Sequence, residues 1–287
     1  MSRWQPRRER FRAILEGDVC VHPASVHDPI SARIAEDLGF EMGMFAGSVA
    51  SLTVLGNPDL ILLTLSEFAG QAHRINRAAE LPVLADADHG YGNALNVMRT
   101  VEELETMGIA GLSIEDTALP QGFGAAGAPE LISVEEGVGK IKAALAARRD
   151  PGLVIAGRTS AAGFVGIEAA IARVKAYESA GADASFLVGV KTREDLEAAA
   201  EALSKPLIIG GAGPGMDDRG WLASLGVRVC LQGHQPFAAA VEAIYATMKA
   251  LRDGTAPKDL PGVAARERMA TLSRVEGHQG WAEKFLR

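Results

Sequence analysis

The sequence predicts a (β/α)₈ barrel of the TIM type with parallel strands. Short apolar runs of strand length alternate eight times with longer segments of helical periodicity, and repeated strand–helix alternation indicates a parallel sheet. All eight units fit between residues 19 and 252. This spacing suits a closed ring better than the alternative, a doubly wound open sheet.

The predicted strands and helices follow one another in order. The strands cover residues 19–22, 42–46, 82–85, 109–114, 153–156, 184–188, 206–209 and 227–231. The helices cover residues 29–38, 65–79, 94–107, 134–148, 167–180, 193–203, 217–225 and 236–252. Asp28 is a candidate N-cap before Pro29, and Gly108 is a C-cap signal.

The two ends of the chain complete the predicted organisation. We expect residues 1–253 to form the barrel with an N-terminal amphipathic helix, because Phe11, Ile14 and Leu15 fall at helical spacing. Residues 254–287 begin with a polar, proline-bearing stretch and continue with two short amphipathic pieces. Such a tail needs a partner surface, most simply a neighbouring subunit.

Composition excludes several classes of function. The formal net charge of −7 argues against nucleic acid as the main partner. No apolar run approaches the roughly 20 residues needed to span a membrane. Cys20 and Cys230 are the only cysteines and lack metal or redox spacing, so we expect buried thiols in a reducing compartment. The arginine-rich N-terminus has no signal-type hydrophobic region, and a soluble cytoplasmic protein is expected.

Candidate chemistry begins in residues 81–93, which read LPVLADADHGYGN. Asp86 and Asp88 end an apolar strand, and residues two apart on a strand point to the same side. Adjacent carboxylates repel unless a cation lies between them, and oxygen ligands suit Mg²⁺ or Mn²⁺. The alternative is a strand end where the aspartates satisfy local amides in an Asx-turn.

Further polar residues stand where other strands end. They are Ser48 after the second strand, Glu115 after the fourth, Arg158 after the fifth and His234 after the eighth. Because barrel active sites lie at the C-terminal strand ends, we expect these residues to converge. The acids would hold a divalent cation, and Arg158 with backbone N–H groups near Ser48 would bind an anionic substrate. The alternatives are a turn residue for Ser48, a salt bridge for Arg158 and a hydrogen-bonded core residue for His234.

A glycine- and alanine-rich segment, residues 121–130, directly follows the fourth predicted strand. In a barrel this places it over the mouth of the active site, where mobile lids occur. It is equally compatible with an ordinary connection.

One ordered set of segments carries a family resemblance: residues 47–50 (GSVA), Asp59, residues 85–93 (ADADHGYGN), residues 114–116 (IED) and residues 157–159 (GRT). This set resembles the isocitrate lyase/phosphoenolpyruvate mutase superfamily over about residues 10–250. The resemblance implies a barrel whose eighth helix is swapped between subunits, in a dimer of dimers. It also implies Mg²⁺, a 2-keto or 2-hydroxy acid substrate and a pyruvate-type enolate.

The resemblance also assigns roles by motif. Asp86 is implied as the direct Mg²⁺ ligand. The residues implied to hold its water shell are Asp59, Asp88 and Glu115. Those implied to bind the substrate carboxylate and the enolate are Gly47, Ser48 and Arg158.

Among the branches of this superfamily, the chain most resembles the bacterial oxaloacetate decarboxylases. The carbon–carbon lyases carry a Lys-Arg/Lys-Cys-Gly-His motif after the fourth strand, whereas residues 121–127 here read QGFGAAG. The polar gating loop of mutases and phosphonopyruvate hydrolases is not visible there either. The segments shared with the decarboxylases are residues 24–29, 86–100, 134–141 and 225–234, and His234 matches that branch's active-site histidine.

The implied reaction is Mg²⁺-dependent decarboxylation of oxaloacetate, or of a 3-substituted 2-keto acid, to pyruvate and CO₂ through a metal-stabilised enolate. Losing CO₂ from a β-keto acid places charge on the 2-keto oxygen, where Mg²⁺ and Arg158 would stabilise it. His234 would orient the departing carboxylate or help to protonate the enolate.

Three departures from the branch leave the substrate open. Residues 210–215 (GGAGPG) replace a tyrosine-bearing loop, Ser160 replaces an acid or amide, and His27 replaces an apolar aromatic residue. One alternative function is therefore a lyase on a larger 2-hydroxy or 2-keto acid, with His234 or His27 in place of the missing cysteine. The other is a non-catalytic protein that binds Mg²⁺ and a keto acid.

Overall fold

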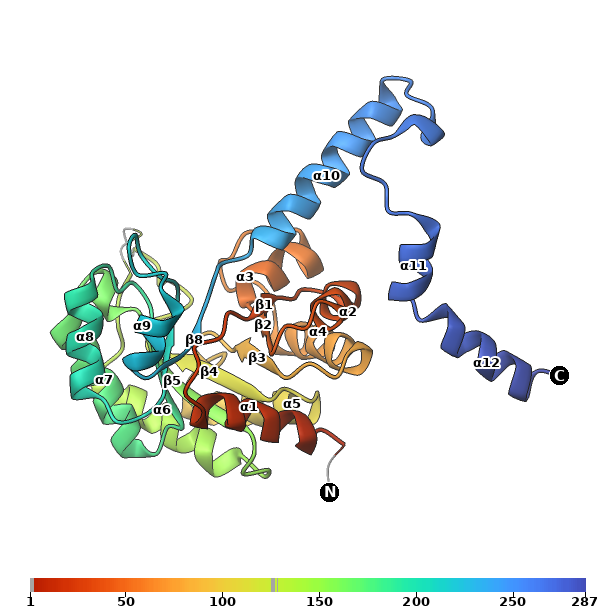
Figure 1. The fold of residues 1–287 in the computed structure, drawn as a ribbon. Helices are drawn as coiled ribbons and strands as arrows, with labels where there is room; N and C mark the ends of the chain where they lie inside the picture. The colour runs from red at the N-terminus through yellow and green to blue at the C-terminus, as the bar shows by residue number, and fades with distance from the viewer. Residues whose placement is uncertain (1–2, 125–126, 128) are drawn as a thin grey trace. The chain divides into compact units, whose positions relative to one another are not determined.

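The computed structural model describes residues 3–124, 127 and 129–287 (Figure 1). The chain forms two compact units, Met1–Gly233 and His234–Arg287. The helix at Gln235–Arg252 (α10), expected from the sequence within the barrel segment 1–253, belongs to the second unit. The two units are described separately.

The first unit is an α/β barrel of the predicted kind. Each strand pairs in parallel with the next one along the chain. A parallel bridge between Val21 and Val229 joins the first segment to the last strand and closes the ring. The strands are β1 (Ala24–Ser25), β2 (Gly43–Phe45), β3 (Val83–Asp86), β4 (Gly111–Glu115), β5 (Val154–Thr159), β6 (Ala184–Leu187), β7 (Leu207–Ile209) and β8 (Val227–Cys230).

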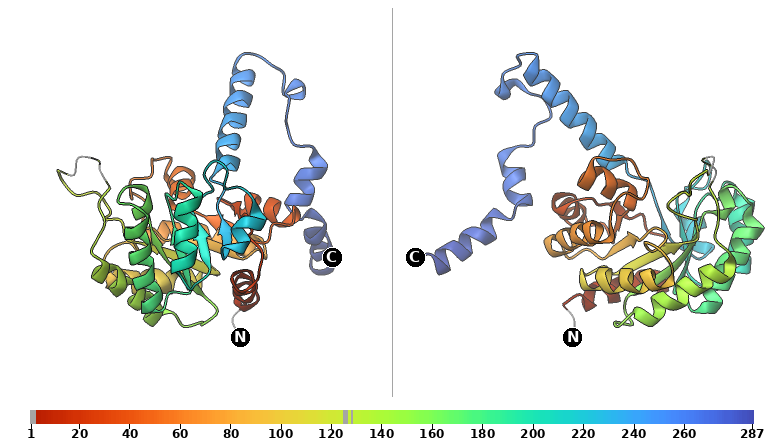
Figure 2. Two further views of the ribbon diagram at one scale, coloured as in Figure 1. Left: turned by 60° about the vertical axis from the view of Figure 1, so that its left-hand side comes forward. Right: turned by 180° about the vertical axis from the view of Figure 1, so that it is seen from behind.

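The helices of the first unit lie outside the strands, as the two views in Figure 2 show. They are α1 (Gln5–Glu16), α2 (Pro29–Asp37), α3 (Gly47–Ala50), α4 (Leu65–Ala78), α5 (Ala94–Thr106), α6 (Val134–Ala147), α7 (Ile167–Ala180), α8 (Arg193–Ala202) and α9 (Arg219–Ser224). The predicted cap at Asp28 is confirmed, because its side chain accepts from the N–H of Ser31 at 2.7 Å.

Two local features differ from the prediction. The first strand lies later than expected, since β1 covers Ala24–Ser25 and Val21 contributes only the bridge to β8. Pro23, which has no N–H to donate, lies between them. The short helix α3 and the π-helical turn Ser51–Leu55 after β2 were not predicted, because four- and five-residue turns carry too little periodicity.

Helix α1 packs on the residues where β4 begins. Phe11 is fully buried against Gly111, where a Cβ would come within 2.2 Å of the Phe11 ring. The buried Arg8 donates to the carbonyls of Ile109 at 3.2 Å and Glu105 at 2.6 Å. This packing covers the N-terminal strand ends and leaves the C-terminal ends for a site.

The second unit consists of α10, α11 (Arg266–Leu272) and α12 (Val275–Phe285). Helix α10 buries none of its side chains, although it carries a set of large apolar residues: Val241, Ile244, Tyr245, Met248 and Leu251. An apolar helix of this kind is expected to be covered by another surface. Among the residues described, no helix has the length and hydropathy that a bilayer crossing requires.

Candidate active site

The stretch after β3, residues 86–92, is here called the carboxylate loop. Asp86 is the last residue of β3, and the backbone then turns through left-handed conformations at Asp88 (φ 47°), Gly90 (φ 82°) and Tyr91 (φ 60°). Aspartate is among the non-glycine residues that adopt this conformation most readily. The N–H of Asp88 donates to Oδ1 of Asp86 at 3.2 Å, so the Asx-type contact that the sequence offered as the alternative is present. Asp88 therefore lies outside β3, in the turn that follows it. The relative orientation of the two carboxylates is set by this turn and not by the alternation of side chains along a strand.

Strand β2 delivers Gly47 directly against the carboxylate of Asp88. A Cβ built on Gly47 would lie 2.8 Å from both Asp88 carboxylate oxygens, which is closer than any real side chain tolerates. The backbone therefore approaches Asp88 so closely that only glycine fits. Ser48, the next residue, is half-buried at the start of α3.

Arg158 links the ends of three strands. The β4–β5 register places it beside Glu115, and its Nη2 lies 3.1 Å from Oε2 of Glu115. Its Nη1 forms an ion pair with Oδ2 of Asp86, and its guanidinium lies 5.5 Å over the ring of Phe186. The salt bridge considered as the structural alternative is therefore present, with two acids at once. The buried Nε of Arg158 has no hydrogen-bond partner among the described residues.

Negative charge exceeds positive charge at this point. Burial and the charges of Asp86, Glu115 and Asp59 raise the pKa of Asp88 well above its ordinary value. Burial also raises the pKa of Glu115, although the charge of Arg158 opposes the shift. Burial alone would lower the pKa of Arg158, but the charges of Asp86 and Glu115 outweigh it and raise that pKa. The charges of three carboxylates, Asp86, Asp88 and Glu115, thus act on one guanidinium, and Asp59 adds its charge at Asp88.

These residues fit a hydrated divalent cation. All the acidic donors are oxygens, which Mg²⁺ prefers, and their mutual repulsion is what a cation relieves. Within the part of the chain that the structure describes, no three His, Cys, Asp or Glu side chains are grouped tightly enough to ligate a metal directly. Mg²⁺ commonly binds through one or two carboxylates and keeps several waters. The arrangement therefore fits one direct ligand with the other acids on its water shell.

Comparisons with known proteins agree with this geometry. Residues 11–252 match the model of the phosphoenolpyruvate phosphomutase family. The chain belongs to this family. It is 58% identical over 271 residues, 94% of each chain, to a protein named oxaloacetate decarboxylase from a Bradyrhizobium species (strain BTAi1).

Solved structures of the superfamily superimpose on nearly the whole chain. One is a phosphonopyruvate hydrolase in complex with oxalate and Mg²⁺, with 27% identity, a TM-score of 0.85 and coverage of 98% of this chain and 99% of that one. Another is 2,3-dimethylmalate lyase, a member of the PEP mutase/isocitrate lyase superfamily, with 27% identity, a TM-score of 0.85 and 99% coverage of both chains. The predicted superfamily and branch are confirmed, and the chain is an enzyme of the oxaloacetate decarboxylase-like lyases.

The remaining predicted residues of this family member lie in different places. Asp59 is exposed in the segment after the π-helical turn, and its charge acts on Asp88. His234 belongs to the second unit, directly before α10, so its place in the site stays a prediction. Residues 125, 126 and 128 of the predicted lid lie outside the described residues. The base of that loop is an antiparallel bridge between Thr117 and Leu131.

Three buried polar groups beside the site were not predicted from the sequence. The carboxylate of Asp116 accepts from the hydroxyl of Tyr177 at 2.8 Å and pairs with Arg173 at 3.1 Å. Tyr91 has a buried hydroxyl without a hydrogen-bond partner among the described residues, and burial followed by the charge of Asp88 raises its pKa. The third group is the ammonium of Lys140. A signal for it existed in the sequence, because Lys140 interrupts an otherwise small or apolar stripe on its helix.

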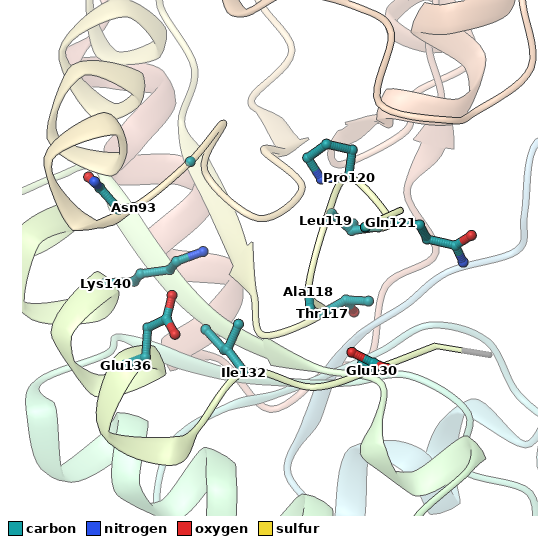
Figure 3. Close-up of a pocket in the computed structure, with 12 residues that line it drawn as sticks. Asn93, Thr117, Ala118, Leu119, Pro120, Gln121, Glu130, Ile132, Glu136 and Lys140 are labelled. Carbon is teal, nitrogen blue, oxygen red and sulfur yellow. The ribbon is translucent and has the colours of Figure 1, made fainter. Parts of the chain in front are cut away.

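A cavity of about 400 Å³ lies beside the carboxylate loop (Figure 3). Lys140 and Glu136 extend from α6 on one side of it, and residues 117–121 form the other side. Gly92 and Asn93, at the end of the carboxylate loop and the start of α5, complete the wall near Lys140. The cavity thus gives the outer side of the carboxylate loop a polar boundary.

Proposed function

We propose that this enzyme catalyses the Mg²⁺-dependent decarboxylation of oxaloacetate to pyruvate and CO₂. The observation that carries the proposal is Arg158, which bridges Asp86 and Glu115 beside Asp88 in a chain closely similar to a named oxaloacetate decarboxylase. A cationic donor next to a cation-binding acid cluster is what a reaction through an enolate requires.

The chemistry defines what the residues must do. The C3–C4 bond of oxaloacetate breaks, CO₂ leaves, and the electron pair moves onto the 2-keto oxygen to give the enolate of pyruvate. A proton then adds at C3. When bound, Mg²⁺ would supply Lewis-acid polarisation of the 2-keto oxygen, held by Asp86 with Asp59, Asp88 and Glu115 around its waters. Mn²⁺ has the same ligand preference and is expected to substitute.

Arg158 must stabilise the charge that develops on the enolate oxygen. In this structure the two Nη groups of Arg158 form ion pairs with Asp86 and Glu115. To reach the substrate, Arg158 must give up at least its contact with Asp86, and this releases the Asp86 carboxylate for a cation. The same side chain therefore keeps the acids paired before binding and serves the substrate afterwards.

Gly47, Ser48 and His234 complete the proposed site. The close contact of Gly47 with Asp88 supports a place for the backbone and hydroxyl of Ser48 near the substrate carboxylate. His234 is assigned through the resemblance, as the group that orients the leaving carboxylate or delivers the proton. Residues 210–215 (GGAGPG) carry no aromatic side chain, which supports a 3-substituted 2-keto acid as a further substrate.

The thiols of the chain support decarboxylation over cysteine-dependent carbon–carbon cleavage. Burial raises the pKa of Cys20 and raises that of Cys230 to about 12. Both thiols therefore stay protonated near neutral pH and are poor proton acceptors. They are the only two cysteines in the sequence.

We also propose that the enzyme works in the cytoplasm as a homotetramer, a dimer of dimers in which α10 is exchanged between subunits. The exposed apolar side chains of α10 support this assembly, because an apolar helix face of this size is expected to be covered by another surface. Multi-angle light scattering of the purified protein tests it, and a monomer at micromolar concentration would reject it.

The direct test of the reaction is to incubate purified enzyme with oxaloacetate and Mg²⁺ and to follow pyruvate with a coupled lactate dehydrogenase assay. The matched control is Asp86→Asn, which keeps the shape of the side chain and removes its charge. We expect pyruvate formation that needs both enzyme and metal and that the variant loses. A wild-type rate equal to the background with Mg²⁺ alone would reject the proposal.

A further inference from the structure

We propose that Lys140 is a positioning residue for this site: its buried ammonium group fixes the carboxylate loop and so the direction in which Asp88 is presented. The inference rests on the proposed function, because it assigns Lys140 to the same cation- and substrate-binding centre.

The carboxylate loop is held from behind at three consecutive carbonyl oxygens. The pairs are Glu115 N–H to Asp88 O at 2.9 Å, Lys140 Nζ to His89 O at 2.9 Å, and Thr100 Oγ1 to Gly90 O at 3.0 Å. Three hydrogen bonds on adjacent peptides fix a backbone that turns through left-handed conformations. Lys140 supplies the only charged donor among them.

A charged donor at this place is costly. Lys140 is only 3% exposed, and burial lowers the pKa of its ammonium group. The charges of Glu136, Glu115 and Asp116 act in the opposite direction and favour the charged form. A neutral donor such as Thr100 satisfies the next carbonyl without this cost. The buried ammonium group of Lys140 therefore binds the backbone of the carboxylate loop and at the same time interacts with the charges of Glu115 and Asp116.

The helix carries Lys140 on its inward face. Gly137, Ile141 and Ala144 lie on the same buried side of α6, which is the side that packs toward the barrel. From there the side chain extends along the wall of the cavity shown in Figure 3 to the carbonyl of His89. His89 directly follows Asp88, so a movement at this carbonyl is passed to the carboxylate through one residue.

Bracing and charge predict opposite effects of removing the ammonium group. Without the brace the carboxylate loop relaxes, and Mg²⁺ should bind more weakly. Loss of a positive charge near Glu115 and Asp116 alone would make the site more negative, and Mg²⁺ should bind more tightly. The sign of the change in Mg²⁺ affinity therefore separates a positioning role from a purely electrostatic one.

The experiment compares three variants in the full-length enzyme. Lys140→Met removes brace and charge, Thr100→Val removes only the neighbouring neutral brace, and Lys142→Met removes an exposed charge from the same helix. Mg²⁺ affinity is measured by titration calorimetry, and kcat and KM are measured with oxaloacetate as substrate. Opening of the carboxylate loop is measured by amide hydrogen exchange of residues 86–92.

We expect Lys140→Met to weaken Mg²⁺ binding by about 10-fold or more, in the range seen for groups that support metal ligands. Its kcat should fall more than its KM rises, and exchange at residues 86–92 should accelerate. Thr100→Val should change the same quantities in the same direction by less. Lys142→Met should stay within about twofold of wild type.

Unchanged or tighter Mg²⁺ binding by a folded Lys140→Met variant, with normal hydrogen exchange, would overturn the positioning role. If that variant does not fold, Thr100→Val decides: wild-type affinity and wild-type exchange would also overturn it. A wild-type enzyme that neither binds Mg²⁺ nor decarboxylates oxaloacetate would reject the proposed function instead. In that case hydrogen exchange in the variants still tests whether Lys140 holds the loop.

Discussion

Replacing Asp88 by asparagine should stabilise the metal-free enzyme and at the same time weaken its response to Mg²⁺. Asp88 shares its surroundings with the carboxylates of Asp86, Glu115 and Asp59, and the single guanidinium of Arg158 is already bound to the first two. The substitution keeps the shape of the side chain and removes one of the repelling charges. Asparagine also accepts the φ of 47° at this position as readily as aspartate does.

The size of the gain follows from the charges. Two like charges about 4 Å apart repel by about 1 kcal/mol in water and about 4 kcal/mol at an effective dielectric constant of about 20. Asp88 is repelled by more than one carboxylate and attracted by one shared arginine, so we expect a gain of at least about 1 kcal/mol. For a chain of this size that corresponds to a rise in Tm of about 2–4 °C.

The pH dependence gives a second test of the same reasoning. Because the pKa of Asp88 is raised in the folded state, the folded protein binds a proton that the unfolded chain releases above its ordinary pKa of 3.8. The stability that Asp88 contributes is therefore present at low pH and is lost as the pH rises through the folded-state pKa. The stabilising effect of Asp88→Asn should be large at pH 8 and should vanish toward pH 4.

The assay is thermal unfolding in EDTA and in excess Mg²⁺, with the exposed Asp217→Asn as control. In EDTA at pH 8, Asp88→Asn should melt higher than wild type, whereas Mg²⁺ should raise the Tm of wild type much more than that of the variant. Asp217→Asn should behave as wild type in both buffers. A variant that melts lower than wild type in EDTA would show that Asp88 is a satisfied turn residue, and the cation argument would lose its basis.

Three further changes test neighbouring parts of the site. Gly47→Ala should lower Mg²⁺-dependent kcat/KM by about 10- to 100-fold, because its Cβ would displace the Asp88 carboxylate. The control Gly70→Ala should keep wild-type kcat/KM, because a Cβ there meets only the end of a long side chain. Equal activity of the two variants would refute the importance of the contact between Gly47 and Asp88. Arg158→Lys should lower kcat by about 10²- to 10³-fold, since a single ammonium cannot replace the two-armed donor; a loss below tenfold would remove Arg158 from the reaction. Burial and then the charge of a neighbouring lysine lower the pKa of His89 to about 4. The unfolded chain therefore binds a proton that folded His89 does not, and wild type should lose stability relative to His89→Gln as the pH falls from 6.5 to 4. Curves of Tm against pH that stay parallel for the two proteins would contradict this.

Much of the barrel could be predicted because its periodicity is strong. Each of the eight expected helices exists within a few residues of its predicted bounds, since apolar stripes and caps mark long helices well. The first strand was misplaced because Pro23 interrupts pairing after Val21, and local pattern does not show which partner a two-residue strand chooses. Helix α10 was correctly predicted as a helix, but its membership of the second unit depends on packing.

The site could be predicted as a set of strand ends, but its connections could not. The rule that C-terminal strand ends gather at one face brought together Asp86, Glu115 and Arg158. The double ion pair of Arg158 depends on the register between strands, which the sequence of one strand does not contain. Two further contacts, Gly47 with Asp88 and Lys140 with His89, depend on how closely the helices pack against the carboxylate loop. Periodicity alone does not predict that packing distance.

The most direct test of the central claim is a crystal structure of the enzyme with Mg²⁺ and oxalate, which mimics the enolate of pyruvate. We predict one Mg²⁺ bound directly by Asp86 through a single carboxylate oxygen, with waters held by Asp88 and Glu115. The oxalate should bridge this cation and Arg158, whose contact with Asp86 should be broken. Oxalate bound away from the carboxylate loop, or Arg158 still paired with Asp86 in the presence of both ligands, would contradict the account.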